Sequence, residues 1–346
     1  MSLGKHFPFV PRFGQLAGAI GLSLGLLVGS LAPQAAQAEG QIRIAEQFGI
    51  VYLLLNVVRD QQLIEKHGQA DGLDIKVDWQ QLSGGSAVND ALLSGAIDIA
   101  GAGIGPLLTV WDRTQGRQNV KGVASLGNFP YYLLSNDPKV KSIADFSDKD
   151  RIAVPAVGVS VQSRFLQYAA AKQWGDKAFD RLDKYTVALP HPDATATLLS
   201  GGTELSGHFS NPPFQNQALE NPRVHVVLDT YELLGPNSPT VLYATEQFRN
   251  DNPKTYKAFV AALAEAADFA QNDKGAAADT YIRVTGAKIS REALLKIIDN
   301  ERFQFSVTPT NTYPLAEFLH RVGAIKNQPA SWQDYFFEDA AIGQGS

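Results

Sequence analysis

Short strand patterns alternate with helical patterns along this chain, and that alternation constrains the fold more than any other feature of the sequence. Polar and apolar residues alternate at 41–46 and again at 73–79, with a helical pattern between them. A further helical pattern and a buried strand pattern at 96–100 follow. The order strand, helix, strand, helix, strand is typical of an α/β domain with a largely parallel sheet.

The same order of patterns recurs in the second half of the chain. Strand patterns at 151–155, 185–189 and 205–210 are separated by a helical pattern through Phe165 and a shorter one at 193–199. Further strands are expected at 121–126, 131–135 and 241–245, with helix from there to the end. The sequence therefore predicts two α/β lobes of related topology.

The stretch 83–106 carries glycines on both sides of a predicted short helix. Gly84 and Gly85 allow a tight turn, and Ser86 is a favoured N-cap residue. A second glycine-rich loop is expected at 103–106, after the strand. Two open loops at neighbouring strand ends, one of them a helix N-terminus with free N–H groups, form either a cradle for a small ligand or two ordinary turns.

The first 38 residues have the composition of an export signal. Lys5 and Arg12 form a positive region, residues 16–31 are apolar and rich in small residues, and Ala36-Gln37-Ala38 matches a small-residue cleavage site. The apolar run is short for a membrane span. We expect export to the periplasm and cleavage after about Ala38, with an uncleaved anchor as the alternative.

Composition narrows the class of protein further. The chain has 346 residues, enough for a large core or two domains, and it contains no cysteine, so no disulfide framework supports it. A bacterial periplasmic protein that folds through its core alone fits this composition. The net charge is −5, and no basic stripe interrupts the mixed charges, which argues against nucleic acid as a partner.

Motifs for catalysis or cofactor binding are missing from the sequence. The six histidines are scattered without metal-ligand spacing, and 158–162 lacks the final glycine of a nucleophile elbow. The glycines at 101–105 do not match a dinucleotide-binding loop. We therefore expect no enzymatic activity, no metal and no cofactor, although a triad assembled from distant residues leaves no local signature.

Several loops without reactive groups remain as candidates for function. They follow predicted strands, at the ends where open α/β sheets bind ligands, and they include Phe48, Ser86, Gly103, Ser160 and residues 208–209. They offer hydrogen-bond donors, aromatic faces and close backbone approach. This is the chemistry of binding rather than of reaction.

Segments in this order, behind an export signal, carry a resemblance to a known family. They are similar to segments of the periplasmic substrate-binding proteins of ABC importers, the nitrate/sulfonate/taurine class. The segments concerned are Ser94–Ala100 with the loop after it, 142–146 with 152–154, and 331–336. The resemblance runs from about Ile42 to Phe337.

The resemblance implies a two-lobed clamshell, similar to the type II periplasmic binding proteins, with two crossing segments. We expect these segments near 131–135 and 240–245, so that residues 39–132 and 243–346 form lobe 1 and residues 133–242 form lobe 2. A ligand that contacts both lobes would favour the closed form. That closed monomer would be recognised by a membrane permease driven by a cytoplasmic ATPase.

The family's pocket, carried over position by position, gives a set of candidate ligand-binding residues. They are Gln47, Phe48, Gly85, Ser86, Gly103, Ile104, Val159, Ser160, Gln162, His208 and Phe209. Ser86 and Ser160 would face each other and donate from helix N-termini, with plain N-capping as the alternative. Phe48 and Phe209 stack on a planar ligand or pack in the core, and His208 donates to an anion or is structural.

The resemblance leaves the ligand open. No arginine is assigned to the pocket, so a sulfonate held by arginine is not supported, and the absence of cysteine removes the signature of the related fungal thiamine-pyrimidine synthases. We expect a receptor that delivers a small organic anion, such as a sulfonate, taurine or nitrate, or a small aromatic or nitrogen compound. A secreted enzyme and a sensory binding protein that docks on a receptor are the alternatives.

Overall fold

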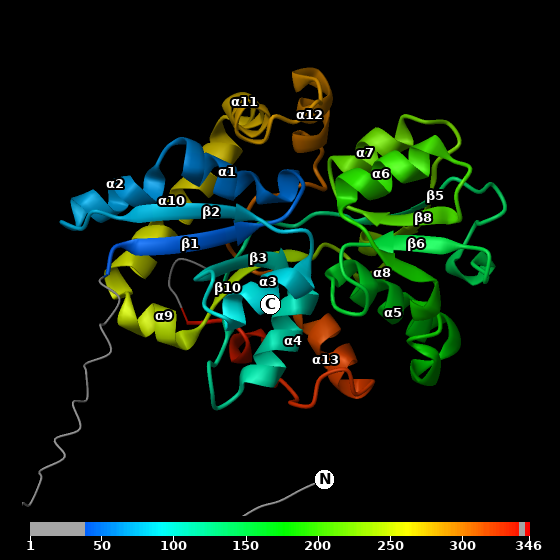
Figure 1. Cartoon of the computed structure of the whole chain (residues 1–346), viewed down its shortest axis with the longest axis horizontal. Helices are drawn as coiled ribbons and strands as arrows, with labels where there is room; N and C mark the ends of the chain where they lie inside the picture. The colour runs from blue at the N-terminus through cyan, green and yellow to red at the C-terminus, as the bar shows by residue number, and fades with distance from the viewer. Residues whose placement is uncertain (1–38, 339–342) are drawn as a thin grey trace, which may run out of the picture. The chain divides into compact units, whose positions relative to one another are not determined.

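Two five-stranded sheets organise the chain (Figure 1). The computed structural model describes residues 39–338 and 343–346, so the predicted export signal lies outside the described residues. The first sheet has the order β2-β1-β3-β10-β4 and the second the order β7-β6-β8-β5-β9. We call each sheet with its covering helices a lobe, lobe 1 for the first sheet and lobe 2 for the second.

The two sheets have the same topology. The first contains β1 (Gln41–Glu46), β2 (Lys76–Gln81), β3 (Ile99–Gly103), β4 (Lys121–Ser125) and β10 (Thr240–Ala244). The second contains β5 (Tyr132–Ser135), β6 (Arg151–Val154), β7 (Thr186–Ala188), β8 (Leu205–Ser210) and β9 (His225–Asp229). β1 pairs in parallel with β2 and β3, as β6 does with β7 and β8, while β10 and β5 are the antiparallel strands of their sheets. The predicted duplication is confirmed, although β9 was not predicted.

Helices cover both faces of each sheet (Figure 1). Those of lobe 1 are α1 (Leu53–Asp60), α2 (Leu63–Ala70), α3 (Gly85–Leu93), α4 (Ile104–Thr114), α9 (Glu246–Asp251), α10 (Pro253–Asn272), α11 (Lys274–Thr285), α12 (Arg291–Ile298) and α13 (Tyr313–Arg321). Those of lobe 2 are α5 (Val161–Trp174), α6 (His191–Ser200), α7 (Phe214–Leu219) and α8 (Thr230–Leu234). Within the described ranges, no helix combines the length and the hydropathy that a membrane span requires.

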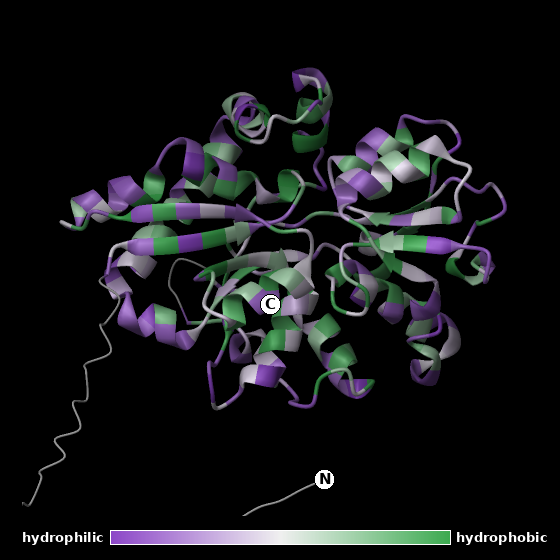
Figure 2. Cartoon of the chain, in the orientation of Figure 1, coloured by the Kyte–Doolittle hydropathy of each residue, from purple (hydrophilic) through white to green (hydrophobic). Residues whose placement is uncertain are grey.

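Burial of the strands follows their sequence patterns. Ile42 and Ile44 of β1 are fully buried, whereas Gln41 and Arg43 are half-buried, and Figure 2 shows the same alternation of hydropathy along β1. Every residue of β3 and β8 is buried. Both lobes therefore place a fully covered third strand at the centre of a sheet.

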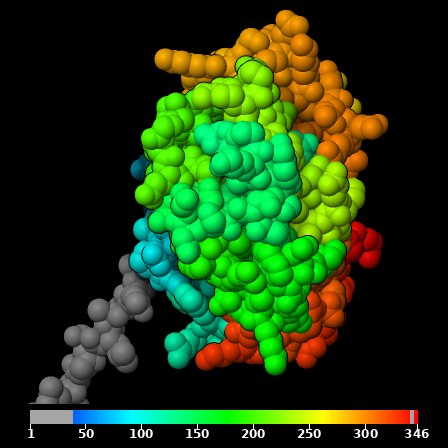
Figure 3. Space-filling model, turned by 90° about the vertical axis from the view of Figure 1, so that its right-hand side faces the viewer, coloured from blue at the N-terminus to red at the C-terminus, as the bar shows by residue number. Residues whose placement is uncertain are grey.

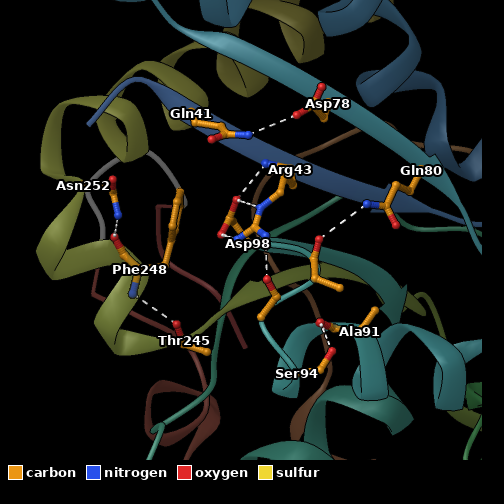
Figure 4. Close-up of polar contacts among 12 residues, drawn as sticks. Gln41, Arg43, Asp78, Gln80, Ala91, Ser94, Asp98, Thr245, Phe248 and Asn252 are labelled. Atoms are coloured by element: carbon orange, nitrogen blue, oxygen red, sulfur yellow. Dashed lines mark hydrogen bonds and ion pairs between the residues drawn. The ribbon is translucent and has the colours of Figure 1, made fainter. Parts of the chain in front are cut away.

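Asp98, the acid of the segment 94–100, has a structural role. The Arg43 side chain donates from Nε to Asp98 Oδ2 at 2.9 Å and from Nη2 to Oδ1 at 2.6 Å, and the Arg43 backbone N–H also donates to Oδ2 (Figure 4). Arg43 Nη1 donates to the carbonyl oxygen of Gly95 at 2.6 Å. A bidentate ion pair of this geometry fixes the start of β3 against β1, so Asp98 stabilises the fold.

The helix predicted within 83–106 forms, but its flanks differ from the prediction. α3 begins at Gly85 with Gly84 as its N-cap, so the prediction that Ser86 caps this helix is wrong. The loop predicted at 103–106 is also wrong, because Gly103 ends β3 and caps α4, which starts at Ile104. Pro106 lies in the first turn of α4, where its missing N–H has no partner to lose.

The lobes are joined by the segments 126–131 and 235–239. The segments predicted to cross, 131–135 and 240–245, instead contain β5 of the second sheet and β10 of the first. A proline precedes each strand closely, Pro130 before β5 and Pro239 before β10. Since proline cannot donate to a ladder, pairing starts after it and the crossing lies a few residues earlier than predicted.

The C-terminal helix α13 of lobe 1 packs against lobe 2. The Phe318 ring lies edge-on to Tyr168 of α5 with centroids 5.0 Å apart, and Arg321 Nε contacts Asp176 Oδ2 at 2.7 Å. In Figure 3 the orange C-terminal segments border the green lobe 2 above and below. The lobes are therefore held by contacts on their flanks as well as by the crossing segments.

Candidate ligand-binding site

A small chamber lies where the two lobes meet, at the carboxyl ends of β1, β3 and β8. Its volume is about 20 Å³, which is room for about one water molecule. We call it the inner chamber. It is lined by Gln47, Phe48, Tyr52, Gly85, Gly103, Pro106, Tyr131, Ser160, Val161, Gln162, His191, Asn211 and Thr240. The polar groups in this lining are amides, hydroxyls and one imidazole, so the chamber can form hydrogen bonds but carries no formal charge.

The structure brings about half of the predicted site residues to this chamber. Those that line it are Gln47, Phe48, Gly85, Gly103, Ser160 and Gln162. Those that do not are Ser86, Ile104, Val159, His208 and Phe209. That any of these residues contacts a ligand stays a prediction.

Ser160 and Ser86 differ although both lie at the start of a helix. Ser160 is the N-cap of α5, its Oγ accepts from the backbone N–H of Ser163 at 3.3 Å, and its side chain is buried in the chamber wall. Ser86 is exposed on α3, one residue into the helix. The prediction that the two serines face each other across the pocket is wrong, because Gly84 and not Ser86 occupies the turn that faces lobe 2.

Three of the other four displaced residues have packing roles. Ile104 is buried in the core, and its N–H donates to the carbonyl oxygen of Pro239 at 3.0 Å. Phe209 is fully buried beside Phe165, with ring centroids 6.4 Å apart. Val159 is half-buried and its carbonyl oxygen faces α4. Of the two roles considered for Phe209, core packing is the one observed.

His208 lies behind the chamber wall and positions a histidine that does line it. His208 Nε2 lies 3.0 Å from His191 Nδ1, and His191 Nε2 lies 3.1 Å from the Gln162 side-chain nitrogen. Burial lowers the pKa of His191 to about 3, and burial together with the nearby His191 lowers the pKa of His208. Both rings are therefore neutral at pH 7, so His208 is structural and offers no charge to an anion.

Glycines of lobe 1 allow the lobes to touch. A Cβ atom on Gly84 would collide with the carbonyl oxygen of Pro155, and one on Gly103 would lie 2.7 Å from Val161 Cβ. A Cβ atom on Gly105 would lie 2.9 Å from the carbonyl oxygen of Val159. These partners all belong to lobe 2. The glycines predicted to form a ligand cradle thus mainly permit close contact between lobes.

Hydrogen bonds also cross between the lobes at the chamber. Asn211 Nδ2 donates to the carbonyl oxygen of Phe48 at 3.0 Å, and the N–H of Ile50 donates to the carbonyl oxygen of Pro212 at 3.1 Å. Gly49, with φ of +123°, lies directly beside this contact. The lobes are therefore in direct contact around the inner chamber, as expected of a closed form.

A second and larger chamber adjoins the first and shares Gln47, Phe48 and Tyr52 with it. Its volume is about 640 Å³, the size of a small-molecule site. It lies between α1 and α11 of lobe 1 and α6 and α7 of lobe 2 (Figure 1). We call it the outer chamber. It is lined by Glu46, Gln47, Phe48, Gly49, Tyr52, Asn56, Gln81, Pro192, Thr195, Ala196, Leu199, Pro213, Phe214, Gln217, Tyr281, Thr285, Ala287 and Lys288.

Glu46 is the notable group in the outer chamber. Its side chain is buried and accepts a hydrogen bond from Asn56 Nδ2 at 3.2 Å. Burial raises the pKa of Glu46 to about 7, against smaller lowering effects of Arg59 and Asn56. No cluster of three histidine or acidic side chains in the described ranges is placed to hold a metal ion.

Some of the lining residues could have been found from the sequence. His191 and Asn211 each follow a strand of lobe 2 within three residues, so the strand-end rule that selected Phe48 applies to them as well. Tyr281 comes from α11, far along the chain, and its helical pattern carries no signal of a pocket. Glu46 falls at the end of a predicted strand, where the alternation of polar and apolar residues does not indicate that it is buried.

The repeated topology, with one antiparallel strand in each sheet and a cleft at the strand ends, defines a two-lobed periplasmic-binding-protein fold. The alkanesulfonate-binding protein SsuA from Xanthomonas axonopodis pv. citri, bound to MOPS, has this fold at 16% identity and a TM-score of 0.66, covering 84% of this chain and 95% of its own. The nitrate-binding protein NrtA from Synechocystis PCC 6803 matches at 15% identity and a TM-score of 0.64, covering 86% of this chain and 84% of its own. At such identities the shared property is the fold.

The chain belongs to the NMT1-like family, whose model matches residues 54–284. A Candida albicans protein described as exhibiting the generic periplasmic binding protein fold is also similar, at 14% identity and a TM-score of 0.61, covering 87% of this chain and 93% of its own. No curated protein sequence matches the chain significantly.

Proposed function

We propose that this chain is an exported solute-binding receptor that delivers a small molecule to an ABC-type importer. The observation that carries the proposal is that both sheets direct strand ends into one cleft, so a ligand there contacts both lobes. Binding and lobe closure are then thermodynamically linked. Membership of the NMT1-like family and likeness to binding proteins of sulfonate and nitrate import support it.

Because the closed inner chamber has room for about one water molecule, its residues would meet a ligand at the walls shared with the outer chamber, and their chemistry favours a small aromatic or nitrogen compound over a small organic anion. Gln47, Gln162 and Asn211 provide amides, and the tyrosines and Phe48 provide flat apolar surface. Burial of a sulfonate or nitrate is costly unless a positive charge accompanies it, and no lysine or arginine of the part of the chain that the structure describes lines this chamber. Helix N-termini alone supply only partial charge.

The remaining parts of the proposal concern location and partners. The segment 1–38 directs the chain to the periplasm and is removed after about Ala38. The closed monomer presents a surface formed by both lobes, which a permease with a cytoplasmic ATPase recognises. An open receptor lacks that continuous surface, so transport is restricted to loaded molecules.

A thermal-shift screen of the protein purified from the periplasm tests the receptor function. Sulfonates, taurine, nitrate, aromatic carboxylates and pyrimidines are compared, and a ligand at a hundredfold excess over its Kd raises the stability by about 2.7 kcal/mol. Uptake of the ligand that also requires the permease supports the proposal. Turnover of a compound without partners supports a secreted enzyme instead, and binding without any effect on uptake supports a sensory protein.

A further inference from the structure

The outer chamber contains a buried acid without a buried base. The side chain of Glu46 is buried, with the residue 6% exposed, and among the described residues its one hydrogen-bond donor is the amide of Asn56, at 3.2 Å. Lys288 is the single lysine or arginine in the chamber lining, and it is exposed at the rim. A carboxyl group taken out of water in this way is stabilised when a cation or a proton accompanies it.

Aromatic rings surround the same space. Phe48 and Tyr52 of lobe 1, Phe214 of lobe 2 and Tyr281 of α11 all line the chamber with Glu46. A cation placed over such faces gains electrostatic attraction in addition to contact area. A carboxylate together with several aromatic faces is the chemistry that recognises an alkylammonium group.

The neighbouring amide points to the same kind of ligand. Asn56 is almost fully buried, its Nδ2 donates to Glu46, and its Oδ1 has no hydrogen-bond partner within residues 39–338 and 343–346. The pair Glu46 and Asn56 is thus rich in acceptors. An N–H donor brought into the chamber would complete its hydrogen bonding.

We propose that the outer chamber binds a small organic cation, a compound with a protonated amine on an apolar or aromatic body, with Glu46 as its counter-ion. This inference rests on the proposed receptor function and names the ligand class. The chamber volume of about 640 Å³ accepts such a molecule without any change of the closed lobes. Because walls of the chamber come from both lobes, the cation also holds them together.

The ionisation of Glu46 gives the binding a pH dependence. The titratable or charged groups that face Glu46 are Tyr52, Arg59 and Tyr281, with Lys288 at the chamber rim. Burial raises the Glu46 pKa to about 7 in the free protein. An ammonium ligand requires the ionised form, so its affinity rises by about tenfold between pH 6 and pH 8, and binding at pH 6 releases a proton.

Three benzyl compounds that differ in charge test the inference, namely benzylamine, benzyl alcohol and benzoate. We expect ligand-observed NMR on the full mature protein to show binding in the order benzylamine, benzyl alcohol, benzoate. Glu46→Gln should abolish the preference for the amine and its pH dependence. Glu292→Gln, which removes an acid from the exposed surface of α12, is the matched control and should change neither.

The wild-type protein supplies a second measurement that does not depend on a variant folding. Calorimetry of benzylamine binding at pH 6, in two buffers of different ionisation enthalpy, should show release of close to one proton. Any one of four results overturns the inference. They are a preference for benzoate, equal binding of benzylamine to wild type and Glu46→Gln, the absence of proton release, and the absence of binding by any benzyl compound. A ligand from the broader screen that binds independently of Glu46 overturns it while leaving the receptor function intact, whereas a screen without any ligand counts against the receptor function itself.

Discussion

The two lobes share one topology but contribute opposite kinds of surface to the cleft. The third strand of lobe 1, β3, reads Ile-Ala-Gly-Ala-Gly and carries no polar side chain, and Gly105 follows two residues beyond it. The equivalent strand of lobe 2, β8, reads Leu-Ser-Gly-His-Phe-Ser and supports the buried pair of His208 and His191. Lobe 1 thus permits close approach, whereas lobe 2 supplies a rigid hydrogen-bonded wall.

The two lobes also place different titratable groups near the cleft. Lobe 1 places the acid Glu46 in the outer chamber, where burial favours its protonated form. Lobe 2 places two histidines in its interior, where burial favours their neutral forms. Both lobes therefore avoid buried charge. The effect of pH on stability has opposite signs in the two, because the group in lobe 1 is an acid and the groups in lobe 2 are bases.

The largest effect is expected from the glycines of lobe 1. Gly84→Val places a branched side chain against the backbone of Pro155, which cannot rotate away, and should destabilise the closed form by about 3 kcal/mol. Since the chain has no cysteine, Asp90→Cys and Lys139→Cys allow one spin label on each lobe. The distance between the labels should shift to longer values.

A matched glycine separates this effect from loss of helix or loop stability. Gly275 lies in α11, where an added Cβ would meet side-chain atoms of lobe 1 alone, the flexible end of Arg291 and, at an ordinary contact distance of 3.4 Å, Asp273 Oδ1. Gly275→Ala should leave the label distance unchanged. If Gly84→Val leaves it unchanged as well, glycine is not what allows lobe 1 to close.

Glu46 of lobe 1 should give the second-largest effect, on the pH dependence of the free energy of unfolding. The Glu46 pKa is about 7 in the folded chain, above its value of about 4.5 in the unfolded chain. Its contribution to stability is therefore fully present below pH 4.5 and is lost as the pH rises through 7, a difference of about 3 kcal/mol. Urea unfolding of wild type and Glu46→Gln at pH 5 and pH 8 measures it, and parallel profiles of the two proteins would contradict the assignment.

The histidines of lobe 2 should give a smaller effect of opposite sign. Burial lowers the His191 pKa to about 3 in the folded chain, so below the unfolded value near 6.5 the unfolded chain binds a proton that the folded chain does not. Stability falls as the pH drops from 6.5 towards 3, by about 2 kcal/mol at pH 5 from this residue. His191→Gln should be less sensitive to acid in the same unfolding assay, and equal sensitivity would mean that His191 is protonated in the folded protein.

The smallest effect concerns the two serines. Ser160→Ala removes the N-cap of α5 and should cost about 1 kcal/mol of unfolding free energy. Ser86→Ala changes an exposed side chain of α3 and should stay within about 0.5 kcal/mol. Equal losses in the two variants, measured by denaturant unfolding at pH 7, would remove this distinction between the lobes.

The sequence predicted the α/β class and the duplication well, because alternation and glycine punctuation are local signals. It misplaced the crossing segments, since both β5 and β10 read as strands but nothing local shows which sheet accepts them. For the site, strand ends identified Phe48, Gly103 and Ser160. The depth of His208 and the exposure of Ser86 depend on packing between elements that are far apart in the sequence.

The central place of β10 in the first sheet has a consequence for how the chain folds. All strands of the second sheet come from one continuous stretch, Tyr132 to Asp229, whereas β10 must insert between β3 and β4 after that stretch has passed. As the chain emerges from its N-terminus onwards, the second sheet can be complete while the first still lacks its middle strand. The order of the strands along the chain therefore makes lobe 2 the earlier folding unit, and lobe 1 closes around contacts of long sequence separation that form last.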